Sequence, residues 1–181
     1  MRAFPAGFMR VAAIVVLGLL TACGFQLRGQ AKLPFETLYV AIPAISPLGI
    51  ELRRHIIAGT GTRLVDAPAK AQAILELVSE ERSKTILSFD TSGQVREHQL
   101  RYRLIFRVHD PRGRDYVPPS EIRLTREISY SSTQVLAKES EEQLLYRDMQ
   151  SDVVQQLLRR LAAAPAQPIA FEPAGKDAAS R

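Results

Sequence analysis

Residues 98–109 read HQLRYRLIFRVH, and this stretch decides the fold. Apart from the first, its even-numbered residues are apolar, and its odd-numbered residues are polar or basic except for Ile105. A period of two sustained over twelve residues is typical of a β-strand with one buried face. We therefore expect a strand with a core face and a basic face, the latter carrying Arg101, Arg103 and Arg107.

A second alternating stretch follows the polar turn at residues 110–113, which reads DPRG. Its apolar residues share one face, which Arg126 interrupts: Ile122, Leu124, Ile128 and Tyr130. Upstream, residues 73–78 and 85–89 form two extended pieces, and a polar turn follows the second. Short polar turns cannot make a parallel crossover, so these strands are expected to pair antiparallel.

One more strand and a first helix precede these segments. Residues 38–42 form a short apolar run between two prolines, as expected of a strand. Ser46 followed by Pro47 is typical of a helix start, and the helix is expected to end at Gly59. Its apolar residues share one face: Leu48, Leu52 and Ile56.

A longer helix is expected after Ser140, which resembles the first residue of a capping box and leaves Lys138 in the preceding loop. Its apolar residues form a stripe: Leu145, Met149, Val153, Val154, Leu157, Leu158 and Leu161. The order β-α-β-β-β-α predicts an α+β fold, with an antiparallel four-stranded sheet covered on one face by two helices. Leu104 and Phe106 are then expected to pack against the longer helix.

The chain begins with the pattern of a secretory signal peptide, residues 1–22. Its apolar run, residues 11–20, is shorter than the roughly 20 residues that span a bilayer. The motif LTAC at residues 20–23 resembles the bacterial lipobox, which implies a diacylglycerol and an N-acyl chain on Cys23, the only cysteine. Gly24 in place of Asp implies the periplasmic side of the outer membrane. The alternative is a buried free thiol beside an ordinary cleavage site.

The mature chain divides into a folded domain at residues 23–162 and an Ala- and Pro-rich tail at 163–181, which is expected to be disordered. The net charge of +5 falls to +3 without residues 1–22, because that segment carries two arginines and no acid. A balance this mildly basic identifies no partner by itself.

Composition argues against an enzyme and against a metal site. One cysteine excludes an internal disulfide and Cys-based metal sites, and three histidines leave little for a His-rich site. No nucleophile lies beside a base, and His98 and His109 are expected on opposite strand faces. We expect no catalytic residue, no metal and no cofactor other than the covalent lipid. Nucleic acid is disfavoured because the chain is exported and no aromatic residue alternates with the arginines.

The arginines of the odd-numbered strand face have two interpretations. They could pair across strands with Glu121 and Glu127 or be solvated, as surface charges commonly are. Eight arginines but only five acids occur from Arg96 to Glu127, so part of this positive charge is expected to remain unpaired. Lipid phosphates or the carboxylates of a partner could accept it.

Two further motifs carry a resemblance to a known family. Residues 23–29 read CGFQLRG at the mature N-terminus, and residues 136–138 read LAK shortly before the acidic pair at 141–142. With the lipobox and the order of elements, the chain from residue 20 to 161 resembles the family of LPS-assembly lipoproteins called LptE.

This resemblance implies a domain inside the outer-membrane barrel LptD, which helps to assemble the barrel and to deliver lipopolysaccharide to the cell surface. It links Lys138 to lipopolysaccharide. The family can also show a basic residue in the preceding hairpin turn, where this chain reads DTSG at residues 90–93, so Arg96 is a second candidate as its substitute. The three arginines of the strand face are candidates because of their charge. A charged strand face would suit the polar interior of a large barrel. The alternative is a free-standing periplasmic lipoprotein that binds a ligand without a barrel.

Overall fold

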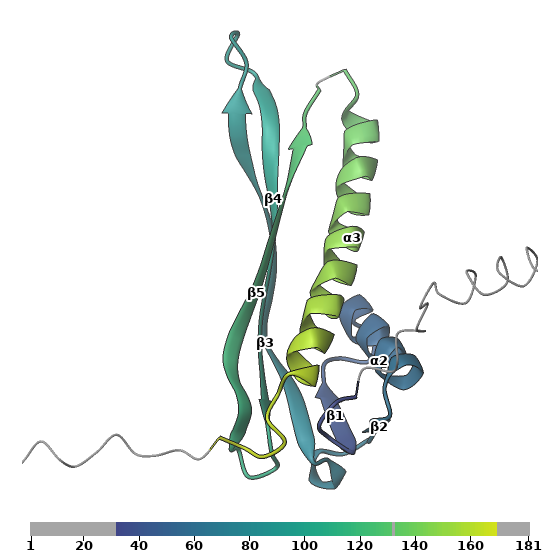
Figure 1. Ribbon diagram of the computed structural model, residues 1–181. Coiled ribbons are helices and arrows are strands. Elements are labelled where there is room, and N and C mark those ends of the chain that lie inside the picture. The colour runs from purple at the N-terminus through teal and green to yellow at the C-terminus, as the bar shows by residue number, and fades with distance from the viewer. Residues whose placement is uncertain (1–31, 132, 170–181) are drawn as a thin grey trace, which may run out of the picture. The chain divides into compact units, whose positions relative to one another are not determined.

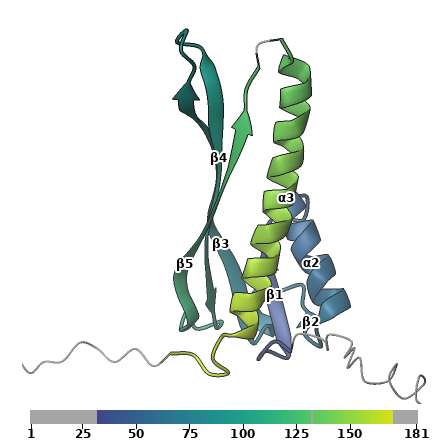
Figure 2. The same cartoon turned by 45° about the horizontal axis from the view of Figure 1, so that its top comes forward.

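The computed structural model describes residues 32–131 and 133–169, which contain five strands and two α-helices. The elements in chain order are β1 (Thr37–Ala41), α2 (Pro47–Gly59), β2 (Arg63–Leu64), the short 3-10 helix η1 (Pro68–Lys70), β3 (Ala73–Phe89), β4 (Val95–His109), β5 (Asp115–Ser129) and α3 (Val135–Ala162). Both α-helices lie on one face of the sheet (Figure 1 and Figure 2). No helix among these residues is long and apolar enough to cross a bilayer.

The sheet is mixed, with the strand order β2-β1-β3-β4-β5. Strand β1 runs parallel to both β2 and β3, and only β3, β4 and β5 pair antiparallel. The α+β class with two helices is therefore confirmed, but the expected four-stranded antiparallel sheet is wrong. Helix α2 carries the chain back along β1, so β2 and β3 run in the same direction as β1. A short turn requires the two strands that it joins to run antiparallel, but it does not determine the direction of strands joined through a helix.

Strand β4 buries the face that its alternation predicted. Leu100, Tyr102, Leu104, Phe106 and Val108 are all buried, whereas the odd-numbered residues are at least partly exposed. The buried residues of α3 join them in one core cluster: Met149, Val153, Val154, Leu157 and Leu161. The expectation that the strand and the long helix share a core is confirmed.

Strand β3 runs without a break from Ala73 to Phe89, where the sequence predicted two separate pieces. Its pairing with β4 shifts register between Leu77 and Ser79, and the residue between them, Val78, is exposed. Because side chains alternate with a period of two, one extra residue exchanges the two faces of the strand.

This exchange changes the chemistry that β3 presents to the helices. Before the shift, Ala73 and Leu75 are buried in the core. After it, Glu80, Arg82 and Lys84 lie on the face toward α3, where Lys84 forms an ion pair with a glutamate of that helix. The layer between sheet and helix is therefore apolar at one end and polar at the other.

Helix α3 begins earlier than its sequence suggested. Gln134 is the N-cap, and Ser140 lies inside the helix with its hydroxyl donating to the carbonyl of Leu136 at 3.1 Å. The capping box expected at Ser140 is therefore wrong, because a serine hydroxyl can also be satisfied by the carbonyl four residues earlier. As a consequence Lys138 lies in the first turn of α3, not in a loop.

The remaining expectations concern the first helix and the chain ends. Ser46 caps α2 as predicted, since its side chain accepts a hydrogen bond from the Gly49 amide at 3.4 Å. Residues 163–169 of the expected tail are described, and the Ile169 amide donates to the Asp115 carbonyl at 2.7 Å. Residues 170–181, the signal segment and Cys23 lie outside the described residues.

Candidate functional site

The five basic residues expected to bind a ligand lie in two places. Arg101, Arg103 and Arg107 project from β4 on the odd-numbered face, opposite the buried face that α3 covers. Lys138 lies on α3. Arg96 lies at the same end of the sheet as Lys138: it is exposed near the start of β4, and its carbonyl accepts a hydrogen bond from the amide of Tyr130, just after β5. The structure therefore does not gather the five into one site.

Lys138 joins the first turn of α3 to the end of β5. Its ammonium donates to the hydroxyl of Ser129 at 2.9 Å and to Oε2 of Glu141 at 2.8 Å. The lysine side chain is 19% exposed. One carboxylate therefore balances part of its charge, while the partly exposed ammonium retains its third donor for an incoming anion.

A cavity of about 370 Å³ opens beside Lys138, between α3 and the ends of the three long strands. Its lining includes a second ammonium, that of Lys84, which lies 2.6 Å from Oε2 of Glu142. The ring of His98 meets that of Tyr130 edge to face, with 5.3 Å between ring centroids. The cavity thus combines paired charges with apolar walls, a lining that suits the charged end of an amphiphilic molecule.

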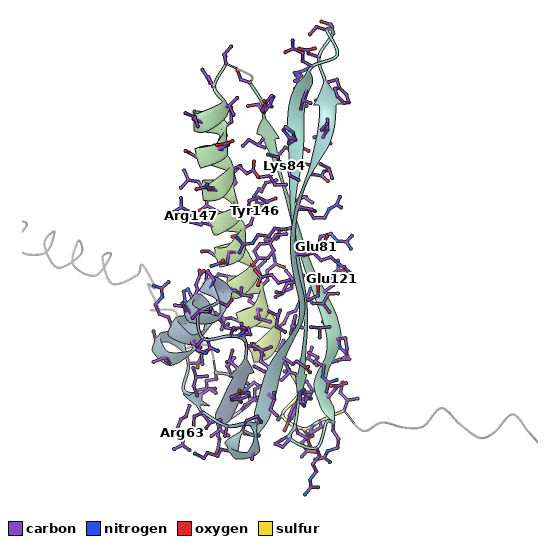
Figure 3. All side chains as sticks on the ribbon, turned by 180° about the vertical axis from the view of Figure 1, so that it is seen from behind. Arg63, Glu81, Lys84, Glu121, Tyr146 and Arg147 are labelled. Carbon is purple, nitrogen blue, oxygen red and sulfur yellow. The ribbon has the colours of Figure 1, made fainter. Side chains whose placement is uncertain are left out.

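The side chains on either side of the sheet can be followed in Figure 3. Lys84 and Tyr146 lie between the sheet and α3, and the Tyr146 hydroxyl donates to the Ser83 carbonyl at 2.8 Å. Glu81 and Glu121 lie on the other side. Lys84 and His98 were missed as site residues, because the bulge in β3 turns Lys84 toward α3 and the earlier start of α3 places Lys138 beside them.

Cross-strand ion pairs occupy the sheet face opposite α3. Nε of Arg103 lies 3.1 Å from Oε2 of Glu121, as predicted, and Arg123 lies 2.5 Å from the other oxygen of that carboxylate. Burial raises the pKa of Glu121, but the hydrogen bond and charge of Arg103, followed by those of Arg123, outweigh it and hold the pKa below its usual value. Glu121 therefore stays ionised and holds both arginines.

Arg107 and Arg101 differ in how their charge is balanced. Nε of Arg107 lies 3.1 Å from Oε2 of Glu76 and 3.7 Å from Oδ1 of Asp115, without well-aligned hydrogen bonds to either. Arg101 donates to the amide oxygen of Gln99 at 3.0 Å and forms no ion pair with any described carboxylate. Within this face Arg101 therefore keeps charge that a partner can use.

The described residues include no group of three or more His, Cys, Asp or Glu side chains placed to hold a metal ion. The arrangement is one of charge pairs and an amphiphilic cavity. Its chemistry is binding by charge and apolar contact.

Comparison with known proteins gives a family and several relatives. The family model described as LptE, lipopolysaccharide-assembly, matches residues 35–161. The LPS-assembly lipoprotein LptE of Photorhabdus laumondii is 29% identical over 147 residues, which are 79% of either chain. The protein of the same name from Yersinia pestis (strain Pestoides F) is also 29% identical over 147 residues, 79% of this chain and 70% of that one.

Solved structures show the same fold. Lipoprotein B from Nitrosomonas europaea is 42% identical, with a TM-score of 0.68 over 77% of this chain and 91% of its own. A minor lipoprotein from Acinetobacter baumannii is 25% identical, with a TM-score of 0.60 over 74% and 97%. The rare lipoprotein B from Shewanella oneidensis, at 24% identity and a TM-score of 0.62 over 70% and 94%, is a likeness of fold alone.

Proposed function

This chain belongs to the LptE family of lipopolysaccharide-assembly lipoproteins, and from that membership we propose that it is the non-enzymatic, lipid-anchored plug of the outer-membrane barrel LptD. Its role in lipopolysaccharide assembly follows from the family match, which spans every strand and nearly all of α3. As a plug it occupies the barrel lumen, assists barrel assembly and helps to insert lipopolysaccharide at the cell surface.

One observation carries the plug assignment, the charged sheet face opposite α3. In the described part of the chain no helix covers it, and ion pairs link neighbouring strands along it. A large barrel has a polar interior, so this face is suited to lie against its wall. Arg101 has charge left for a carboxylate of the wall, because no described acid pairs with it.

We place the contact with lipopolysaccharide at the cavity beside Lys138. Two ammonium groups, those of Lys84 and Lys138, line this cavity together with His98. Exposed Arg96 lies near the same strand end and supplies further charge. The phosphates of lipid A are anions that such groups bind by charge-assisted hydrogen bonds. Arg103 and Arg107 lie on the opposite face of β4 and do not line this cavity, which makes them weaker candidates.

The anchor is the lipid on Cys23, a diacylglycerol with an N-acyl chain. Stable attachment to a bilayer takes about two acyl chains, and this anchor has three. The domain is thereby held on the periplasmic side of the outer membrane without a spanning helix.

Co-isolation of the barrel tests the plug assignment. The lipidated chain is extracted from outer membranes in mild detergent, and a stoichiometric barrel subunit is expected with it. Arg101→Glu should reduce the barrel yield by repelling wall carboxylates, whereas Arg159→Glu, an exposed charge reversal near the end of α3, should leave it unchanged. A monomer with no barrel would favour the free-standing ligand-binding lipoprotein.

A further inference from the structure

Helix α2 carries apolar side chains on its outer face as well as on its buried face. Leu48, Leu52 and Ile56 pack in the core. Ile50 and Ile57 point away from it and are 52% and 69% exposed. They are seven residues apart, two helical turns, so they lie on one side of the helix.

The segment before α2 extends this apolar surface. Ile45 is 88% exposed and precedes the N-cap of the helix. A shallow hollow of about 490 Å³ lies between that segment and the helix, lined by Ala44, Ile50, Arg53, Arg54, Ile57 and Ala58. We call Ala44, Ile45, Ile50, Arg54 and Ile57 the α2 patch.

The charge on the patch is positive. Arg54 is exposed and belongs to none of the ion pairs of the described residues. Arg53 donates to the carbonyl oxygens of Val40 and Ile42, which hold its guanidinium at the rim of the hollow. The one acid of α2, Glu51, is turned toward α3, where it accepts hydrogen bonds from that helix. No residue lining the hollow is acidic.

We propose that the α2 patch docks on the anionic phospholipid surface of the leaflet that holds the Cys23 lipid. The inference rests on the lipidation of Cys23 and goes beyond the plug assignment. Isoleucine side chains enter the boundary between headgroups and acyl chains, and arginines beside them meet lipid phosphates. With the guanidinium of Arg54, that of Arg53 at the rim of the hollow and no carboxylate in the lining, the patch matches an anionic lipid surface in charge.

The short link between the Cys23 lipid and the domain makes even weak docking of the α2 patch effective. Eight residues separate Cys23 from Lys32, where the described chain begins, so this link spans at most about 30 Å. A patch on a domain tethered by so short a link meets the bilayer at high effective concentration and needs little affinity of its own. Docking would orient the domain relative to the membrane, whereas the lipid alone leaves it free to rotate.

Tryptophan fluorescence tests the proposal, because the chain contains no tryptophan. The lipidated chain with Ile57→Trp, together with any co-isolated barrel, is placed in vesicles of phosphatidylethanolamine and phosphatidylglycerol with or without brominated acyl chains. The matched control is Leu136→Trp, at a residue that is 79% exposed in the first turn of α3. Bromine quenches only tryptophans in contact with the acyl region. We expect quenching at least about twofold stronger for Ile57→Trp than for the control.

Each outcome is decisive once circular dichroism shows that both variants fold. Adding Arg54→Glu to Ile57→Trp should reduce the quenching, and phosphatidylcholine vesicles should reduce it as well. Equal quenching in both tryptophan variants, or none in Ile57→Trp, overturns the proposal. A blue shift without quenching means that a protein covers the patch and also overturns it. Barrel co-isolation from the same samples reports separately on the plug assignment.

Discussion

The guanidinium of Arg82 on β3 donates a hydrogen bond to Oε1 of Gln150 on α3 at 2.9 Å. The same guanidinium lies 4.7 Å from the ring centroid of Tyr102, whose hydroxyl donates to Oε1 of Glu80 at 2.5 Å. Gln150 in turn donates to Glu51 of α2 at 2.8 Å. This polar seam, defined by these five residues, joins the sheet to both helices where apolar packing gives way to charge.

The first prediction concerns the phenol at the centre of the seam. Burial, followed by the hydrogen bond to Glu80, raises the pKa of Tyr102 far above its usual value, so the phenol remains a donor. Tyr102→Phe removes that donor from a partly buried carboxylate and should cost about 1–3 kcal/mol of the free energy of unfolding. Urea denaturation measures this. Tyr130→Phe, at the exposed end of β5, should change little, and an unaltered Tyr102→Phe protein would contradict the role of the seam.

Replacement of Phe106 by alanine tests the assignment of strand faces. Its ring is buried in the core, so the cavity should cost about 3–5 kcal/mol. Ile105 lies on the opposite face and is partly exposed, and Ile105→Ala should cost much less. Equal losses in chemical denaturation would mean that the two faces are assigned wrongly.

Acid should destabilise the turn between β4 and β5 through Asp110. Burial raises the pKa of the Asp110 carboxyl, but hydrogen bonds from the backbone amide and side chain of Arg114 and from the Arg112 amide outweigh it, so the folded pKa is lowered. The charged form is therefore favoured by folding. The contribution of the ionised Asp110 to the free energy of unfolding is therefore fully present at pH values above its ordinary pKa of about 4. It is lost as the pH falls through the lower pKa of the folded state.

The matched variant is Asp110→Asn, which keeps the size of the side chain and removes the charge. Its melting temperature should lie below that of the parent protein at neutral pH, and the gap should shrink in acid. A gap that is the same at every pH would show that the charge of Asp110 contributes nothing.

Charge reversal at Lys138 tests the proposed contact with lipid A. Lys138→Glu should weaken binding of purified protein to lipopolysaccharide more than Lys138→Ala does, because it repels phosphate. Added salt should narrow the difference, since screening shortens the reach of an exposed charge to about 8–10 Å. Ser129→Ala removes a hydrogen-bond acceptor of the ammonium and keeps its charge, so it should retain binding. Undiminished binding by Lys138→Glu, with the barrel complex intact, would move the contact elsewhere.

Acylation of Cys23 is tested by metabolic labelling with a fatty acid. The parent chain should incorporate label and Cys23→Ala should not, because the chain has no other thiol to receive the lipid. Label retained in Cys23→Ala would disprove the anchor.

Arg126 shows where sequence patterns stop being informative. It interrupts the apolar face of β5, and alternation alone does not indicate which group pairs with a charged side chain on the face toward the helix. In the structure its guanidinium lies 2.7 Å from Oδ2 of Asp152 on α3. The two residues are far apart in sequence, and only the packing of the helix along the strand brings them together.

The sequence by itself determined the elements whose patterns are local. The alternation of β4, the serine cap of α2 and the apolar stripe of α3 each follow from a period or from one turn of backbone, and the structure confirms them. These patterns also sufficed for the α+β class. The motifs at Cys23 and Lys138 carried the resemblance to the family that the comparisons confirm.

Only the tertiary structure decided the parallel pairing of β1, the exchange of faces in β3 and which residues line the cavity. Whether two strands joined through a helix run parallel depends on where that helix returns the chain. The extra residue at Val78 is recognisable only against the register of the neighbouring strand, since a bulge is a mismatch between two strands. Lys84, His98 and Lys138 come from three elements, and Lys84 joins the other two only because that mismatch turns it toward α3. Such relations depend on long-range packing, which no local period of the sequence encodes.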